Sequence, residues 1–314
     1  MKSFALALLP FVLLVGCARK DETPAAAGER SLRIYTTIAP IYYVTRQLLG
    51  DRDMVINTVP AGEDSVTYIP DRSVLTDMLT ADLVILNGAG FEEWLEKVSL
   101  PDRLFFDSAH VFKDEWLVYE GVVHSHGGQD DHSHEGYNGH TWLAPAYFQR
   151  QVRAIYEKLK TVLTEEEQQT RNLSANFDAL DARLTALDAQ ARTVFAPLQG
   201  TTLAATHPTY DYLAKSYGFA IFNIDIDPDA EEITGHIQRE LDKLRKQRET
   251  TNISFLLWEE DPSDVLLEAV AGLQLINIVF PPFDDVDDPD YFTGMSETLE
   301  QIAEIIRMAG QDET

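Results

Sequence analysis

Short apolar segments alternate with longer amphipathic segments along most of the chain from Leu32 onward. The short segments are rich in β-branched and aromatic residues, as buried strands are, whereas the longer ones repeat apolar residues at helical spacing. The predicted strands cover 32–37, 54–59, 83–87, 202–206, 219–226, 253–258 and 275–280. The predicted helices cover 41–49, 71–80, 209–217, 232–248, 263–271 and 291–308, with a short one that ends at Trp94.

This alternation with short connections is typical of parallel sheets that are covered by helices. It occurs twice, so the expected fold class is α/β with two lobes, each a mostly parallel sheet flanked by helices. The N-terminal lobe is expected over 32–143 and the C-terminal lobe over 200–314. Ligands bind at the carboxyl ends of the strands in such sheets. The cleft between the lobes is therefore the expected binding site.

Helices are predicted for the residues between the lobes, 144–199. A first helix covers 145–163, and a capping box, Thr164 to Glu167, starts the next. Its apolar residues recur at alternating spacings of four and three; they are Leu173, Phe177, Leu180, Leu184, Leu187, Ala191, Val194 and Leu198. The spacing predicts one helix over 165–198, about 50 Å long, that joins the lobes as a rigid strut. The alternative is the seam of a coiled-coil dimer.

The N-terminus has the pattern of a secretory signal. A single lysine precedes an apolar run that ends at Cys17 and is too short for a bilayer span of roughly 20 residues. The closing residues Leu14 to Cys17 resemble the lipobox of bacterial lipoproteins, so residues 1–17 are expected to be a signal peptide and Cys17 to be lipidated. The polar, small residues 18–31 are expected to form a flexible tether.

Charge and cysteine content limit the possible ligands. The formal net charge of −27 makes nucleic acid and anionic lipid surfaces poor partners. Cys17 is the only cysteine, so a metal would have to be held by His, Asp and Glu.

Histidines supply the candidate chemistry, and five of the eight lie between 124 and 140. The segment 121–139 has no periodicity and reads as a long surface loop. It carries two His-x-His pairs, His124 with His126 and His132 with His134, which suit zinc, copper or nickel. The alternative is a solvated polar loop.

Two further histidines are placed to face the cleft. His140 follows the loop, and His207 follows the strand 202–206 at its carboxyl end. A lone histidine is more often a surface or structural residue than a ligand, but two at strand ends in different lobes favour a shared metal ion. His110 is expected to be a structural residue, and His236 is expected on a solvated helix face.

Three motifs, in this order, resemble the TroA-like family of zinc and manganese substrate-binding lipoproteins of ABC importers. They are the Asn-Gly-x-Gly-x-x-x-Trp segment at 87–94, the His-x-Trp-Leu-x-Pro segment at 140–145 and the His-x-x-Tyr-x-Tyr segment at 207–212. The resemblance covers Leu32 to Met308. It implies that His140 and His207 are metal ligands and, with the histidine-rich insertion, it points to the zinc branch.

The sequence departs from the family pattern at two ligand positions. Val66 stands where the family has its first histidine, and Phe280 where it has an aspartate. Structural zinc takes four ligands, so other groups must complete the site. Glu259, after the strand 253–258, is the preferred replacement, and Asp64 is a second one. Glu260, Asp284, Asp285 or a loop histidine are further possibilities, with Asp284 and Asp285 favoured as solvated acids.

The expected function is a monomeric carrier of zinc, ahead of manganese or copper. It would be lipid-anchored on the periplasmic or extracellular side of the cell envelope and would pass the ion to an ABC permease. Two alternatives stay open. A degenerate relative could act as a surface adhesin or structural lipoprotein. A zinc hydrolase would need an open coordination position and a general base, and the chain has no His-Glu-x-x-His motif.

Overall fold

The computed structural model describes residues 31–118 and 136–312. The predicted signal peptide, the predicted lipidation site Cys17 and all of the predicted tether except Ser31 lie outside the described residues. The same holds for His124, His126, His132 and His134 of the predicted loop.

The N-terminal lobe contains a parallel sheet of four strands in the order β2-β1-β3-β4. Its strands are β1 (Arg33–Thr36), β2 (Met54–Asn57), β3 (Leu83–Leu86) and β4 (Phe105–Asp107). The helices α1 (Ala39–Leu49) and α2 (Arg72–Met78) are the predicted ones. The short helix at Trp94 is the 3-10 helix η1 (Glu93–Lys97). The strand β4, η2 (Asp102–Leu104) and η3 (Ser108–Glu115) were not predicted.

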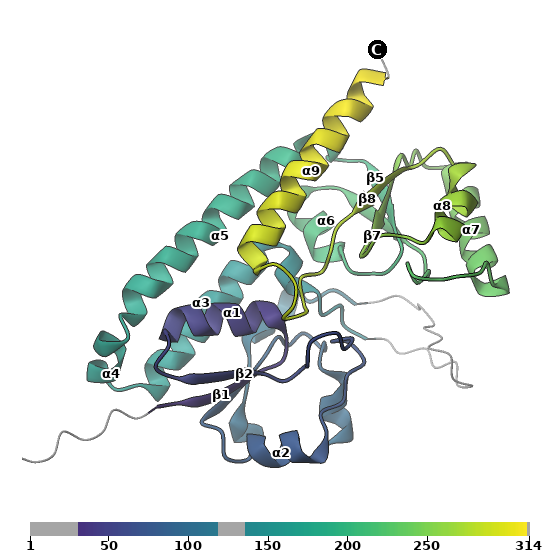
Figure 1. Cartoon of the computed structure of the whole chain (residues 1–314). Coiled ribbons are helices and arrows are strands. Elements are labelled where there is room, and N and C mark those ends of the chain that lie inside the picture. Colours follow the sequence, from purple (N-terminus) through teal and green to yellow (C-terminus); the bar gives the residue numbers. More distant parts are fainter. Residues whose placement is uncertain (1–30, 119–135, 313–314) are drawn as a thin grey trace, which may run out of the picture. The chain divides into compact units, whose positions relative to one another are not determined.

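The C-terminal lobe repeats this topology, with a parallel sheet in the order β6-β5-β7-β8. Its strands are β5 (Thr202–Ala205), β6 (Ala220–Asn223), β7 (Phe255–Trp258) and β8 (Ile276–Val279). The helices are α6 (Asp211–Tyr217), α7 (Gly235–Arg248) and α8 (Asp264–Ala271), and α9 (Tyr291–Asp312) closes the described chain. The predicted fold class of two mostly parallel sheets flanked by helices is confirmed (Figure 1).

The predicted single helix over 165–198 is wrong, because two helices cover this segment. They are α4 (Glu165–Thr170) and α5 (Leu173–Phe195), and the turn η5 (Ala196–Leu198) follows. Asn172 between them is left-handed, with φ of 53°, a conformation that a helix cannot continue through. The preceding Arg171 makes a paired contact with Asp53 in the N-terminal lobe, with N–O distances of 2.6 and 2.8 Å. Both side chains of this ion pair are buried, so the chain is held to the N-terminal lobe directly before Asn172.

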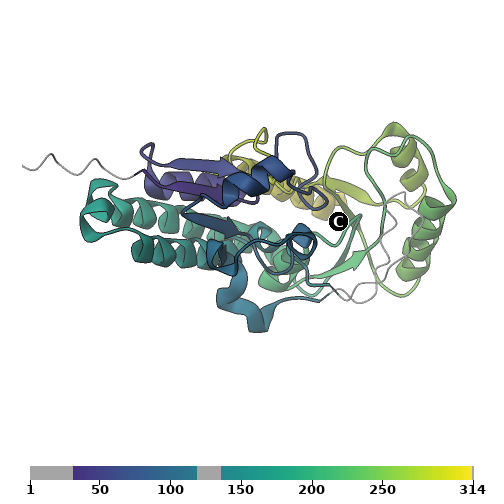
Figure 2. The ribbon, with the colours of Figure 1, turned by 90° about the horizontal axis from the view of Figure 1, so that it is seen from below.

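The predicted apolar stripe is nevertheless buried along its whole length. The helix α5 packs against α3 (Pro145–Val162) and α1 and also against α6 and α9, so it contacts elements of both lobes. Figure 2 shows α3 and α5 side by side. Asn176 of α5 donates to the Leu48 carbonyl at 3.0 Å, and Asp188 accepts from the Tyr217 hydroxyl at 3.1 Å. The stripe therefore packs within the chain, which leaves no seam for a coiled-coil dimer.

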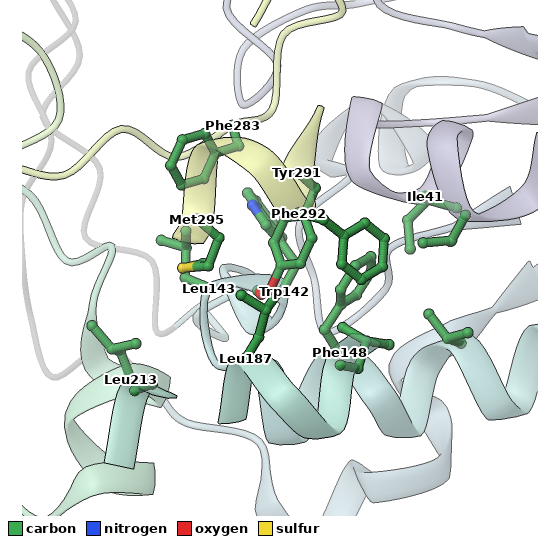
Figure 3. Packing of buried hydrophobic residues seen from close by; sticks show 14 of the residues in the cluster. Ile41, Trp142, Leu143, Phe148, Leu187, Leu213, Phe283, Tyr291, Phe292 and Met295 are labelled. Atoms are coloured by element: carbon green, nitrogen blue, oxygen red, sulfur yellow. Dashed lines mark hydrogen bonds between the residues drawn. The ribbon is translucent and has the colours of Figure 1, made fainter. Parts of the chain in front are cut away.

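One hydrophobic core continues through both lobes. At its centre the Trp142 indole donates to the Pro282 carbonyl at 2.6 Å, and the Tyr291 hydroxyl donates to the Trp142 carbonyl at 2.7 Å. The Tyr291 ring packs on Phe148 of α3, with centroids 4.6 Å apart (Figure 3). The segment that begins at His140 is thereby fixed to both lobes. None of the helices in the described part of the chain is long and apolar enough to cross a membrane.

Candidate metal centre

The strand order of each sheet creates a crevice at its carboxyl edge. In the N-terminal sheet β1 lies between β2 and β3, and in the C-terminal sheet β5 lies between β6 and β7. Successive connections therefore leave in opposite directions, and ligands bind at such switch points. Thr37 and Asn87 follow β1 and β3, whereas His207 and Glu259 lie just beyond β5 and β7. The predicted placement at strand ends is confirmed for His207 and Glu259 and wrong for His140, which directly precedes the 3-10 helix η4 (Thr141–Leu143).

His207 and Glu259 are in direct contact. The Nδ1 atom of His207 lies 2.9 Å from Oε2 of Glu259, and the Thr209 hydroxyl donates to the other oxygen of the same carboxylate. The side chains of His207 and Glu259 are about one-fifth exposed. A histidine with a carboxylate on one ring nitrogen has a fixed orientation, as metal-bound histidines have.

Carboxylates surround His207 on its other side as well. Its Nε2 lies 3.5 Å from Oδ1 of Asp227 and 3.8 Å from Oδ1 of Asp225. Burial lowers the pKa of His207, but Glu259 and these two aspartates outweigh burial and hold the pKa above its ordinary value. Burial likewise raises the pKa of Glu259, and the contact with His207 more than compensates, so that the pKa is lowered.

Asp225 also binds His236. The Nε2 atom of His236 lies 3.0 Å from Oδ2 of Asp225 and 2.9 Å from its carbonyl oxygen. The predicted surface position of His236 is correct in that the side chain is 37% exposed. His110, assigned to structure, is exposed on η3.

His140 has the opposite surroundings. Its ring lies edge-on to Phe91, with centroids 5.6 Å apart, and against Trp142 at 5.2 Å. Burial lowers its pKa to about 4, although the charges of Glu259 and Asp64 raise it. Neutral imidazole is the form that binds metals, so His140 is ready to act as a ligand near neutral pH.

A buried polar network holds the backbone beside His140. The Asn87 amide donates to the Gly139 carbonyl at 2.7 Å, and the Thr141 hydroxyl bonds to Asn87 at 3.1 Å and Gln151 at 2.9 Å. The carboxyl group of Glu92 accepts from the backbone N–H of Asn87 at 2.7 Å. Burial raises the pKa of Glu92 to about 7.

The loop 61–70 approaches the C-terminal lobe through hydrogen bonds to two aspartates. The Ser65 hydroxyl donates to Asp284, and the Gly62 N–H donates to Asp285 at 2.5 Å. Burial raises the pKa of Asp284 to about 7, with a further contribution from the charge of Glu259. The interpretation of Asp284 as a solvated acid is therefore wrong. The contact of Asp284 with Ser65 could not be predicted from the sequence, because the two residues lie 219 positions apart.

Val66 and Phe280, which the resemblance placed at two ligand positions of the family, pack as apolar side chains. Phe280 is wholly buried in the main core, and Val66 packs against the same core. Asp64, two residues before Val66, accepts from the Val66 N–H at 2.9 Å and from the Thr67 hydroxyl at 2.7 Å. Its carboxylate is thus held in a local turn, while its charge still acts on His140.

The structure brings His207 and Glu259 into contact and places His140 where the charges of both act on it. Across residues 31–118 and 136–312, no three His, Cys, Asp or Glu side chains are arranged to hold one ion. Sequence reasoning missed Thr209 and Asn138, which bind the backbone or side chains of this group. Asn138 had one usable signal, because an Asn two residues before His140 favours a local turn.

The chain matches a known family model over residues 34–305, described as the zinc-uptake complex component A, periplasmic, or ZnuA. It is 25% identical to the zinc-binding lipoprotein AdcA of Streptococcus pneumoniae, over 93% of this chain and 57% of AdcA. It is also 25% identical to the high-affinity zinc uptake system protein ZnuA of Bacillus subtilis, over 83% of this chain and 82% of that protein. The chain therefore spans little more than half of AdcA.

Solved structures share the fold. The Zn(II)-bound AdcA of S. pneumoniae superposes with a TM-score of 0.71 and 22% identity, over 88% of this chain and 58% of AdcA. Its ZnuA-like domain alone gives a TM-score of 0.69 and 22% identity, with 88% and 99% covered. The Mn²⁺ complex of FpvC from Pseudomonas aeruginosa gives 0.71 and 22% identity, with 89% and 100% covered. Both sheets and the helices around them therefore have the same fold as these structures.

Proposed function

Because the chain belongs to the ZnuA family of zinc-uptake components, we propose that it binds zinc between its two lobes and passes the ion to an ABC importer. In this proposal the protein is an extracytoplasmic carrier, anchored through a lipid on Cys17, and has no catalytic turnover. Relatives that bear the names AdcA and ZnuA are described as zinc-binding and zinc-uptake proteins, which supports zinc as the cargo.

One observation supports the site more than any other. Glu259 contacts His207 directly, and its charge acts on His140, which comes from the other lobe. We assign zinc to His140, His207 and Glu259, with Asp64 or Asp284 as the additional acid. Imidazole nitrogen and carboxylate oxygen are zinc ligands at about 2.0–2.2 Å, so the ion would draw these groups together.

Calorimetric titration with zinc, manganese and copper tests the site in three proteins. They are the wild type, the variant with His140→Ala and His207→Ala, and a deletion of 122–137. Four-ligand zinc sites bind with about 10–16 kcal/mol, or about 3 kcal/mol per ligand. Loss of two ligands should therefore weaken zinc binding about 10⁴-fold. High-affinity binding that survives the double substitution but not the deletion would place the ion in the histidine-rich segment instead.

The second candidate is a degenerate relative that acts as a surface adhesin or structural lipoprotein. The apolar packing of Val66 and Phe280 at two family ligand positions favours it. It predicts that the wild type binds none of the three metals with high affinity, which the same titration decides.

The lipid anchor has a separate test. Labelled fatty acid should be incorporated into the wild type expressed in a bacterial host and not into Cys17→Ser. Equal labelling of both proteins would contradict the anchor.

A further inference from the structure

Asn138 is a buried residue whose side chain contacts the backbone of two segments, the one around His140 and the one around His207. These segments are the two histidine loops. Its Oδ1 accepts from the His140 N–H at 2.9 Å and lies 3.4 Å from Nδ1 of the same ring. Its Nδ2 donates to the Pro208 carbonyl at 2.7 Å and to Oδ2 of Asp211 at 2.8 Å. Pro208 directly follows His207. One amide group therefore connects the two candidate ligands across the lobes.

The hydrogen-bonding groups of the Asn138 side chain are all paired. Asn138 is 1% exposed, and both its oxygen and its NH2 group have partners within 2.9 Å. A buried amide whose donors and acceptor are all paired holds its position firmly, since any shift leaves a polar atom unsatisfied.

Backbone contacts also hold the segment 138–140 in place. The Asn138 N–H donates to the Leu117 carbonyl at 2.7 Å, and the Leu117 N–H donates to the Tyr212 hydroxyl of α6 at 3.0 Å. Gly139 lies so close to Phe91 that a Cβ would come within 2.6 Å of the Phe91 side chain. The segment 138–140 is thus held between α6 of the C-terminal lobe and the N-terminal lobe.

We propose that Asn138 is a positioning residue that sets the spacing of His140 and His207 for the metal. This inference rests on the proposed function. Zinc accepts its nitrogen ligands at about 2.0–2.1 Å, so a small displacement of one loop against the other is costly. Removal of groups that orient metal ligands typically lowers metal affinity by about 10- to 100-fold.

Asn138→Ala tests the proposal, with Asn223→Ala as the matched control. The Asn223 amide donates to the same Asp211 carboxylate, at 3.3 and 3.5 Å. Both substitutions therefore remove an amide partner of Asp211, but only Asn138 also contacts the two histidine loops. Zinc affinity would be measured by competition with a chelator, and the visible spectrum of the Co²⁺-loaded protein would report ligand geometry.

We expect Asn138→Ala to weaken zinc binding about 10- to 100-fold and to change the Co²⁺ spectrum, while Asn223→Ala stays within about threefold of the wild type. If Asn138→Ala does not fold, Asn138→Ser serves instead. A serine hydroxyl can still accept from the His140 N–H but is too short to bridge to Pro208. A purely structural role would lower the thermal midpoint of both asparagine variants without changing the Co²⁺ spectrum.

The histidine double variant separates the two possible failures. If it no longer binds zinc while Asn138→Ala binds as tightly as the wild type, the positioning role is overturned and the site stands. If the double variant binds zinc as tightly as the wild type, the site and the positioning role are both overturned.

Discussion

The two imidazoles of the proposed site come from lobes with the same sheet topology but have opposite surroundings. His140 lies against Phe91 and Trp142, and burial lowers its pKa to about 4. His207 faces three carboxylates, which hold its pKa above the ordinary value despite burial. The fold brings a histidine to each side, but the side chains beside each ring shift the two pKa values in opposite directions.

The largest expected effect is the difference between the two pKa values. In metal-free protein, NMR titration should show His140 neutral down to about pH 4, whereas the pKa of His207 should lie above the ordinary value of a histidine. The variants His140→Ala and His207→Ala assign the signals. Two histidines that titrate together near 6.5 would remove the basis of the comparison.

The same pKa shifts affect stability in opposite directions. Between about pH 6.5 and 4, His140 binds a proton in the unfolded protein but stays neutral in the folded one. The contribution of His140 to stability therefore falls as the pH drops from 6.5 towards 4. His207 stabilises the folded protein below pH 6.5, and this contribution is lost as the pH rises through its raised pKa.

Glu259→Gln should have the next largest effect, because it removes an acid that acts on both histidines. We expect zinc binding to weaken about 100-fold, the contribution of one ligand. Glu260→Gln is the control, since Glu260 is the adjacent acid and is exposed. Both variants would be titrated with zinc in parallel. Equal, small losses in the two would mean that the charge of this region matters and the Glu259 contact does not.

Val66→His should have the smallest effect and the opposite sign. It puts an imidazole where the sequence resemblance implies the first histidine of the family. A ligand contributes up to about 3 kcal/mol, so zinc binding should tighten by no more than about 100-fold. The lost apolar packing of a half-buried valine lowers the stability of the metal-free and the metal-bound protein alike, by about 1 kcal/mol. Ile69→His, three residues along and exposed, should leave zinc binding unchanged. Tighter binding by Ile69→His alone would mean that the loop presents a different residue to the metal.

Local sequence signals predicted most of the fold. The strands of the central sheets and the stripe on α5 were found because each repeats apolar residues at a clear period. The three-residue strand β4 is too short to show a period. The break at Asn172 was missed because the capping box and the stripe are each helical signals. The contact of Arg171 with Asp53 beside the break spans 118 residues, so no local pattern indicates it.

The site was predicted in part for the same reason. The motifs around His140 and His207 are local and could be recognised, and Glu259 follows a recognisable strand. The contacts of Asn138 with Pro208 and of Ser65 with Asp284 span 70 and 219 residues. No local pattern encodes such pairs, so the groups that hold the ligands in place could be found only in the folded protein.

X-ray absorption at the zinc edge, on the zinc-loaded protein with residues 122–137 deleted, tests the central claim most directly. The histidines of the deleted segment cannot contribute to that spectrum. We expect a fit with two imidazoles and one or two carboxylate oxygens at about 2.0–2.2 Å, and the loss of both imidazoles in the His140→Ala, His207→Ala variant. A shell without imidazole in the deleted protein, or one that the double variant leaves unchanged, would contradict a zinc site shared by the two lobes.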